Sequence, residues 1–253
     1  MKETIIKAVQ VCKSFAHNGN QNHVLDMIDL DIYAQDFTVI MGSSGAGKST
    51  LLYALSAMDR ITSGNVIYRD KEISTMKERE LAQLRAEEFG FVFQQTHLVS
   101  NLSLFENVIV PGYLDNHRSA KQVRKRAVQL LQKMNIEKAA GRLPFQVSGG
   151  EAQRAAIARA IINEPAVLFA DEPTGALNKR NSEEVLQLLS TLHEEGQSIV
   201  MVTHDIRTAV YATRLLYLED GKILDEMTLP PYKEQDSRSR EAQVNAWLTS
   251  LEW

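Results

Sequence analysis

The sequence has little of the chemistry that cross-links a protein or holds it in a membrane. Cys12 is the only cysteine among the 253 residues, so no disulfide can form within the chain, and a reducing compartment fits. We expect that thiol to be a small buried apolar residue. No uninterrupted apolar run reaches the roughly 20 residues of a membrane-spanning helix, and the N-terminus lacks the apolar stretch of a signal peptide. If the protein works at a membrane, we expect another polypeptide to hold it there.

An excess of positive charge is also absent. The formal net charge is −4, so no global basic field indicates nucleic acid, and we expect no nucleic-acid partner. Hydrophobic residues make up 44% and charged residues 24% of the chain, which is typical of a globular protein. The length allows one large domain or two small ones.

Apolar runs predict an α/β fold. Two early segments, 4–11 and 23–33, alternate and indicate an antiparallel sheet with one solvated face. Nearly continuous apolar runs, typical of strands covered on both faces, occupy residues 37–42, 89–94, 166–171 and 198–204. Each of these runs ends in glycine or in polar residues, as in parallel sheets that bind ligands beyond the carboxyl ends of their strands.

Helical patterns separate the predicted strands. We expect helices at 49–57, 75–88, 119–135, 151–163 and 182–196, and a hairpin at 215–226 with an Asp220–Gly221 turn. The helix at 119–135 carries a basic cluster, Lys121 and 124–126. A solvated face explains this cluster best, and acidic lipid or a partner is the alternative.

The stretch MGSSGAGKST, residues 41–50, places three glycines around one lysine. It fits the pattern G-x-x-x-x-G-K-[ST] between a predicted strand and a predicted helix. Glycine lets backbone N–H groups approach a triphosphate closely, and the following helix directs its positive N-terminal end at the anion. Lys48 adds a charge for the terminal phosphates and Ser49 a hydroxyl for Mg²⁺. We assign the whole cradle to a nucleotide triphosphate: Gly42, Ser43, Ser44, Gly45, Ala46, Gly47, Lys48, Ser49 and Thr50.

Two carboxylates follow the buried run AVLFA. Phosphate-loop enzymes need a carboxylate at the end of another strand to hold Mg²⁺, and Asp171 is the candidate. Glu172 is the candidate catalytic base that activates a water for attack on the γ-phosphate. The alternative for Glu172 is an ordinary loop carboxylate.

The stretch VSGGEAQR, residues 147–154, predicts a second anion site. Ser148 and Glu151 form a capping box that opens a helix, and Gly149 and Gly150 leave its first N–H groups accessible. One chain then carries two helix starts that suit phosphate.

Together these stretches resemble the ATP-binding-cassette ATPases, with the resemblance running from about residue 4 to residue 226. GSSGAGKST is similar to their Walker A motif, VSGGEAQR to their signature and VLFADEPTGAL to Walker B with the D-loop. The resemblance further implies that Gln94 is the Q-loop glutamine, which senses Mg²⁺ and the γ-phosphate. It makes His204 the switch histidine that contacts the γ-phosphate, and Phe15 the aromatic that stacks on adenine.

The resemblance implies a fold and an assembly. The fold is a P-loop (RecA-like) α/β ATPase core, residues 1–226, with an antiparallel β subdomain and an α-helical signature subdomain. Two copies sandwich two ATP molecules, so that the signature residues Ser148 to Glu151 of one subunit cap the ATP in the other's cradle. Three departures stand out: Val147 replaces the usual leucine, Ala152 interrupts the signature, and Asn178 replaces the D-loop aspartate.

Within the family, ADEPTGAL and FVFQQTHLVSNLSLFENV resemble the lipoprotein-release, macrolide-export and bacitracin-type peptide-resistance ATPases. The resemblance implies an FtsX-like permease partner and a place on the cytoplasmic face of the plasma membrane. The permease would dock on residues about 94–115, where Leu98, Leu102 and Phe105 suit docking and core packing about equally. The alternatives are a cassette ATPase without a permease, a nucleotide-dependent binding module with low turnover and, more weakly, a small-molecule kinase.

The tail, 227–253, is expected to be a polar linker and an amphipathic helix. Val244, Trp247, Leu248 and Leu251 recur at helical spacing, and Trp253 follows. We expect this helix to fold back on its own domain. A contact with the permease or with the second ATPase subunit is the alternative.

Overall fold

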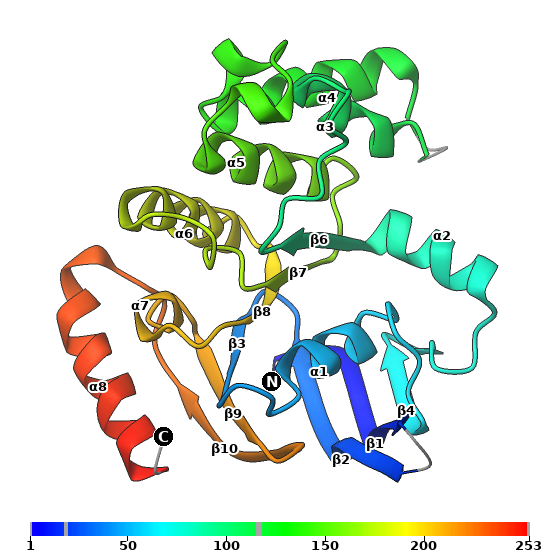
Figure 1. The fold of residues 1–253 in the computed structure, drawn as a ribbon, viewed down its shortest axis with the longest axis vertical. Coiled ribbons are helices and arrows are strands. Elements are labelled where there is room, and N and C mark those ends of the chain that lie inside the picture. Colours follow the sequence, from blue (N-terminus) through cyan, green and yellow to red (C-terminus); the bar gives the residue numbers. More distant parts are fainter. Residues whose placement is uncertain (1, 18–19, 115–117, 252–253) are drawn as a thin grey trace. The chain divides into compact units, whose positions relative to one another are not determined.

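The computed structural model describes residues 2–17, 20–114 and 118–251 (Figure 1). The chain divides into two compact units. Unit 1 comprises Met1–Leu81 and Gly196–Trp253, and unit 2 comprises Ala82–Glu195. Helix α2 (Glu78–Glu88) runs across the division at Leu81.

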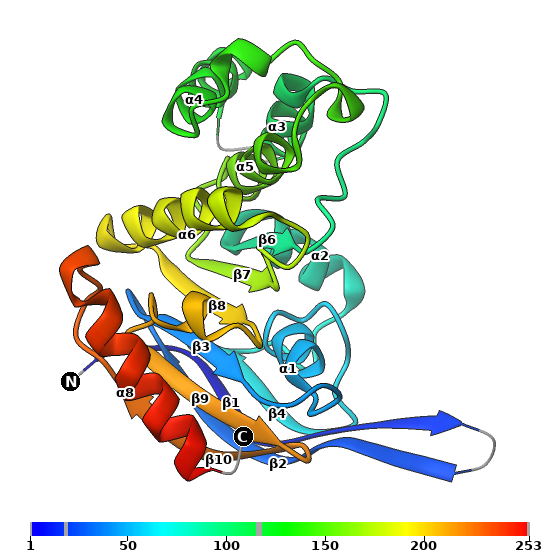
Figure 2. The ribbon, with the colours of Figure 1, turned by 60° about the vertical axis from the view of Figure 1, so that its left-hand side comes forward.

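Unit 1 contains two sheets. Its elements are β1 (Thr4–His17), β2 (Asn20–Tyr33), β3 (Phe37–Met41), α1 (Lys48–Leu55), β4 (Ser63–Tyr68), β5 (Lys71–Glu72), β8 (Ser198–Val202), α7 (Ile206–Ala209), β9 (Arg214–Glu219), β10 (Lys222–Thr228), η3 (Glu234–Asp236) and α8 (Ser237–Ser250). The first sheet has the order β2-β1-β4-β5 and is antiparallel, and its β1–β2 hairpin is long (Figure 2). In the second, β3 lies between β8 and β9 and is parallel to both, whereas β10 pairs antiparallel with β9.

Burial explains the strand types in unit 1. Every residue of β3 and of β8 is buried, as the continuous apolar runs predict for strands covered on both faces. Tyr217 and Phe37 of unit 1 are among the largest fully buried side chains of the described residues. The predicted strands and the hairpin turn at Asp220–Gly221 are confirmed, and β1 extends six residues beyond the predicted 4–11.

Unit 2 is mainly helical. Its elements are β6 (Phe89–Phe93), α3 (Leu104–Gly112), α4 (Ala120–Lys133), η1 (Glu137–Ala139), η2 (Pro144–Gln146), α5 (Gly149–Ala160), β7 (Val167–Asp171) and α6 (Lys179–Glu194). The strands β6 and β7 pair in parallel. The apolar stripe of α4 is buried, as its spacing predicts; it consists of Val123, Ala127, Leu130, Leu131 and Met134.

The tail helix α8 packs on unit 1, as expected, and lies beside α7 (Figure 2). Val244 and Leu248 are buried, and the indole N–H of Trp247 donates to Asp225 over 2.8 Å. Arg240 is buried as well and donates to three backbone carbonyls. Trp253 lies outside the described residues. A domain boundary at residue 226 stays a prediction.

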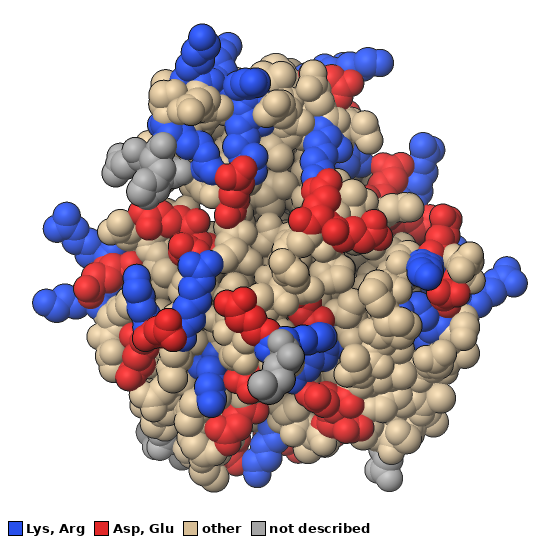
Figure 3. Space-filling view, turned by 180° about the vertical axis from the view of Figure 1, so that it is seen from behind, with Lys and Arg blue, Asp and Glu red and all other residues tan. Residues whose placement is uncertain are grey.

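Two expectations need correction. Cys12 is half-buried instead of buried, and its sulfur accepts from the Met27 N–H over 3.3 Å. Arg126 is not part of a solvated face, because it donates to the carbonyls of Ile161 and Ile162, while its neighbours Lys121, Arg124 and Lys125 are exposed. Basic side chains gather at the top of the view in Figure 3, and acidic and basic side chains mix elsewhere on that face.

Residues 98–105 lead into a helix that was not predicted from the sequence. Ser103 and Glu106 form a capping box that starts α3, and Leu98, Leu102 and Phe105 are each half-buried. The exposed apolar side chains nearby are others: Val99, Val110, Tyr113 and Leu114. Among the described residues, no helix combines the length and the apolar character that crossing a bilayer requires.

Candidate functional site

The glycine loop lies in unit 1 between β3 and α1, and its backbone leaves no room for a side chain at Gly42 or Gly47. At Gly42 an added Cβ atom would lie 1.9 Å from the Leu218 carbonyl oxygen. Gly47 has φ 101°, and a Cβ there would lie 2.8 Å from the Val24 carbonyl oxygen. Gly47 is also the N-cap of α1 and supplies no side-chain cap, so the first N–H groups of that helix suit an anion. The loop therefore fits the phosphate groups of a nucleotide.

Lys48 holds its charge over this loop. Its ammonium donates to the Gly42 carbonyl over 2.8 Å and to the Ser43 carbonyl over 2.7 Å. A phosphate is a stronger acceptor for a cation than a neutral carbonyl, so the same group suits the terminal phosphates of ATP.

Parallel pairing places His204 beside the loop. The register joins Ile40 of β3 to Val202 of β8, so the residues that follow the two strands leave at the same edge of the sheet. His204 is exposed there, and Asp205 next to it caps α7 by accepting from the Arg207 N–H over 2.9 Å. Unit 1 thus brings the predicted cradle and the predicted switch histidine to one edge.

Unit 2 brings the Q-loop and Walker B residues together in the same way. Phe93 pairs with Asp171, so Gln94 and Glu172 follow adjacent strand ends. The Gln94 side chain lies against Gly175, where an added Cβ atom would be 2.8 Å from its Nε2.

Glu172 occupies an unusual backbone conformation. Its φ is 45°, in the left-handed region that costs a non-glycine residue about 1 kcal/mol or more. Such strain gathers at functional sites, and it agrees with a carboxylate whose direction matters.

The predicted metal ligands belong to different units, but their chemical groups are of the type that binds Mg²⁺. Ser49 is in unit 1, whereas Gln94 and Asp171 are in unit 2. Within the described ranges, no three or more His, Cys, Asp and Glu side chains form a metal cluster. Hydroxyl, amide, single carboxylate and phosphate oxygens together form the ligand set that Mg²⁺ takes in nucleotide sites.

The signature stretch starts α5 as its capping box predicts. Ser148 Oγ accepts from the Glu151 N–H over 3.3 Å, and the Glu151 carboxylate accepts from the Ser148 N–H over 2.8 Å. The backbone hydrogen bond from Ser148, followed by its hydroxyl bond, lowers the pKa of Glu151 from its ordinary value of 4.5. Gln153 on the same helix donates to the Phe93 carbonyl over 3.0 Å, which ties the signature helix to the end of β6, directly before Gln94.

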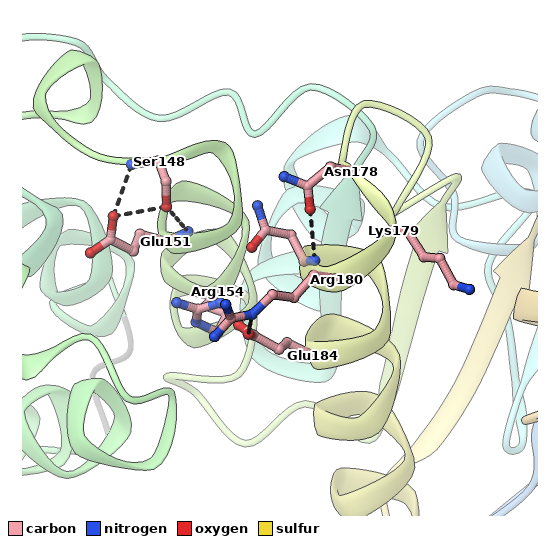
Figure 4. A pocket seen from close by; sticks show the side chains of 8 residues that line it. Ser148, Glu151, Arg154, Asn178, Lys179, Arg180 and Glu184 are labelled. Atoms are coloured by element: carbon pink, nitrogen blue, oxygen red, sulfur yellow. Dashed lines mark hydrogen bonds and ion pairs between the residues drawn. The ribbon is translucent and has the colours of Figure 1, made fainter.

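An open pocket of about 570 Å³ lies between the starts of α5 and α6 (Figure 4). Ser148, Glu151 and Arg154 line it from α5, and Asn178, Lys179, Arg180, Asn181 and Glu184 from α6. Asn178 caps α6 by accepting from the Asn181 N–H over 3.0 Å, so the residue at the D-loop position is also the N-cap of this helix. Arg154 pairs with Glu184 over 2.8 Å and so joins the two helices.

Sequence reasoning missed Arg154, Asn181 and Glu184. The i,i+4 spacing of Arg180 and Glu184 was a readable signal for one ion pair. The pair between Arg154 and Glu184 joins residues 30 apart in sequence, and spacing alone gives no signal for it.

Phe15, the predicted adenine platform, lies on β1 and is 45% exposed. With it, unit 1 contains the aromatic, the cradle and the histidine, and unit 2 contains the Q-loop, Walker B and signature residues. The role of each residue in nucleotide binding or catalysis stays a prediction.

The α/β fold, the glycine cradle after β3 and the carboxylates at the end of β7 define a P-loop ATPase. A protein-family model described as ABC transporter matches residues 25–175. The chain belongs to the ABC transporter family, and it is an ATP-hydrolysing cassette that uses ATP and Mg²⁺.

Individual relatives agree with this assignment. The macrolide export ATP-binding/permease protein MacB of Pasteurella multocida is 39% identical over 224 residues, 88% of this chain and 34% of that protein. MacB of Wolinella succinogenes is 42% identical over 223 residues, again 88% of this chain and 34% of that protein. The chain thus spans about a third of the length of these curated relatives.

Solved structures match over more of their length. The ATP-binding cassette MJ0796, in a dimeric post-hydrolysis state with ADP and Pi, gives a TM-score of 0.83 at 37% sequence identity. The alignment covers 90% of this chain and 100% of that one. CbiO1 of Clostridium perfringens, part of the ABC transporter complex cbiONQ, gives 0.79 at 26% identity over 99% of this chain and 98% of that one.

Proposed function

We propose that two copies of this chain close on two ATP molecules and that their opening and closing drives a membrane permease. The observation that carries the proposal is that one chain contains two helix starts suited to phosphate, at Gly47 and at Ser148. In a head-to-tail dimer each ATP contacts one helix start from each subunit, so both helix starts of the chain bind phosphate. The dimeric state of the similar cassette MJ0796 supports this arrangement.

We propose the following roles within the site. Lys48 and the backbone N–H groups before α1 bind the phosphates, Ser49, Gln94 and Asp171 hold Mg²⁺, and Glu172 orients the attacking water. Bound to these three metal ligands, Mg²⁺ would neutralise charge on the transferring phosphate. The signature residues Ser148 to Glu151 bind the γ-phosphate of the second copy's ATP. His204 stabilises charge on the γ-phosphate of the ATP in its own subunit's cradle. ATP bound at both sites favours the closed dimer, and hydrolysis favours opening.

A trapped dimer tests the proposal. Glu172→Gln should bind ATP without hydrolysing it, and sedimentation should then show a dimer with ATP and a monomer with ADP. Adding Ser148→Arg to the same chain should leave ATP binding intact and abolish the dimer. A monomer at saturating ATP in Glu172→Gln, or an ATP-dependent dimer that persists with Ser148→Arg, would contradict it.

We further propose that the permease is of the FtsX-like type and that the complex acts at the cytoplasmic face of the plasma membrane. The role proposed for the complex is antimicrobial-peptide resistance or a related export, extraction or mechanotransmission function. The likeness to MacB proteins, whose name joins an ATP-binding part to a permease, supports a permease partner. The exposed apolar side chains around α3, Val110, Tyr113 and Leu114, suit docking to it.

Copurification tests the partner. The chain should copurify with an FtsX-like permease, and Leu114→Ser should weaken that complex while the ATPase activity of the isolated chain stays unchanged. A chain that turns over ATP and binds no permease would favour the cassette ATPase that acts alone. Negligible turnover of wild type with intact ATP binding would favour the nucleotide-dependent binding module.

A further inference from the structure

The strands that carry Phe15 pass beside the phosphate cradle in unit 1. Phe15 on β1 pairs with Asn22 of β2, and Lys13 pairs with Leu25. At Gly47 an added Cβ atom would lie 3.2 Å from the Leu25 side chain. The β1–β2 hairpin and the start of α1 are therefore in contact close to Phe15.

Lys13 occupies one face of the Phe15 ring. Its ammonium lies 4.8 Å from the ring centroid, within the range of a cation–π interaction. Lys13 is 9% exposed, which is unusual for a lysine, whereas Phe15 is 45% exposed. One face of the aromatic ring is thus covered by a buried cation, and much of the ring remains available to a ligand.

The ammonium of Lys13 is fixed by two further contacts. It donates to the Arg60 carbonyl over 2.5 Å and pairs with Asp59 over 2.7 Å. Asp59 belongs to the turn that ends α1, where its N–H donates to the Tyr53 carbonyl over 3.2 Å. Lys13 therefore ties the aromatic ring to the C-terminal end of the helix whose N-terminus forms the phosphate cradle.

We propose that Lys13 is a positioning residue that holds the Phe15 ring so that its other face stacks on the adenine of ATP. The inference rests on the proposed nucleotide site. A ring held by a buried cation loses less freedom when a base stacks on it, and an aromatic face accepts a base and a cation on opposite sides. Because α1 is a short rigid helix, the link through Asp59 also fixes the distance between the base platform and the cradle.

Two probes separate base recognition from phosphate binding. ATP uses both the ring and the cradle, whereas inorganic tripolyphosphate uses the cradle alone. In Lys13→Met we expect ATP to bind roughly tenfold more weakly and tripolyphosphate to bind as in wild type, measured by titration calorimetry on the full chain. Lys13→Arg should restore ATP affinity, because a guanidinium also stacks on an aromatic face.

Controls make each outcome decisive. Lys7→Met removes an exposed cation from the same strand and should change neither affinity. Phe15→Ala should weaken ATP binding, and adding Lys13→Met to it should cause little further loss. If Lys13→Met disturbs folding, Asp59→Asn offers a milder test with the same expected selectivity.

Unchanged ATP affinity in Lys13→Met, or equal loss for both probes, would overturn the inference while leaving the proposed function intact. Wild-type protein that binds neither probe would instead overturn the proposed function.

Discussion

Arg240 should anchor the C-terminal helix α8 to unit 1, and replacing it by methionine tests this. The side chain is 2% exposed. Its Nε donates to the Val210 carbonyl and one terminal nitrogen to the Pro230 carbonyl, each over 2.6 Å, and the other terminal nitrogen donates to the Ala212 carbonyl. Burial lowers the pKa of the guanidinium, but arginine stays charged in proteins.

The magnitude follows from these three bonds. Hydrogen bonds from a charged donor contribute about 1.5–3 kcal/mol each, and removing a buried charge returns part of that sum. We expect Arg240→Met to lower the free energy of unfolding by about 3 kcal/mol. For a chain of this length the melting temperature should then fall by about 6–12 °C.

Thermal unfolding with a matched control decides the question. Arg238 is exposed on the same helix, and Arg238→Met should change stability by less than about 0.5 kcal/mol. Equal melting temperatures for Arg240→Met and Arg238→Met would refute the claim that the buried guanidinium holds α8 in place.

Three further predictions concern the site. Gly42→Ala should abolish ATP binding measured by calorimetry, because its Cβ would lie 1.9 Å from the Leu218 carbonyl oxygen; near wild-type binding would contradict the cradle geometry. Asn178→Ala should cost about 1 kcal/mol in denaturant unfolding by removing the cap of α6, whereas Asn178→Asp should stay within about 0.5 kcal/mol. The capping box at Ser148 lowers the pKa of Glu151, so its stabilisation is present above pH 4.5 and is lost as pH falls through the lower folded pKa. Glu151→Gln should therefore flatten the fall in stability below pH 4.5, and an unchanged pH profile would count against that bond.

Much of the fold could be predicted because its signals are local. Continuous apolar runs marked β3, β6, β7 and β8, and the capping box at Ser148 lies within four residues. The glycine loop could be predicted because phosphate binding by backbone N–H groups requires glycine at fixed positions of the sequence. Here pattern and structure agree because both arise from neighbouring residues.

What could not be predicted depends on distant contacts or competing signals. The start of α6 at Lys179 was missed because Asn178 was considered as a D-loop residue and not as an N-cap. The helix α3 was hidden by apolar residues that suited docking equally well. Arg240 gave no signal, because its carbonyl partners lie 10, 28 and 30 residues away.

Mixing two inactive variants tests the central claim most directly. If each ATP site is built from two subunits, the mixture should regain ATPase activity, whereas sites contained within one subunit would stay inactive. Lys48→Ala lacks a working cradle and Ser148→Arg lacks a working signature start, so each alone should be inactive. In a mixed dimer one ATP meets the intact cradle of one subunit and the intact signature of the other. We expect the mixture to recover up to about a quarter of wild-type ATPase activity, since half of the dimers are mixed and each has one intact site. Activity no higher than that of the separate variants, under conditions where mixed dimers are shown to form, would contradict the account.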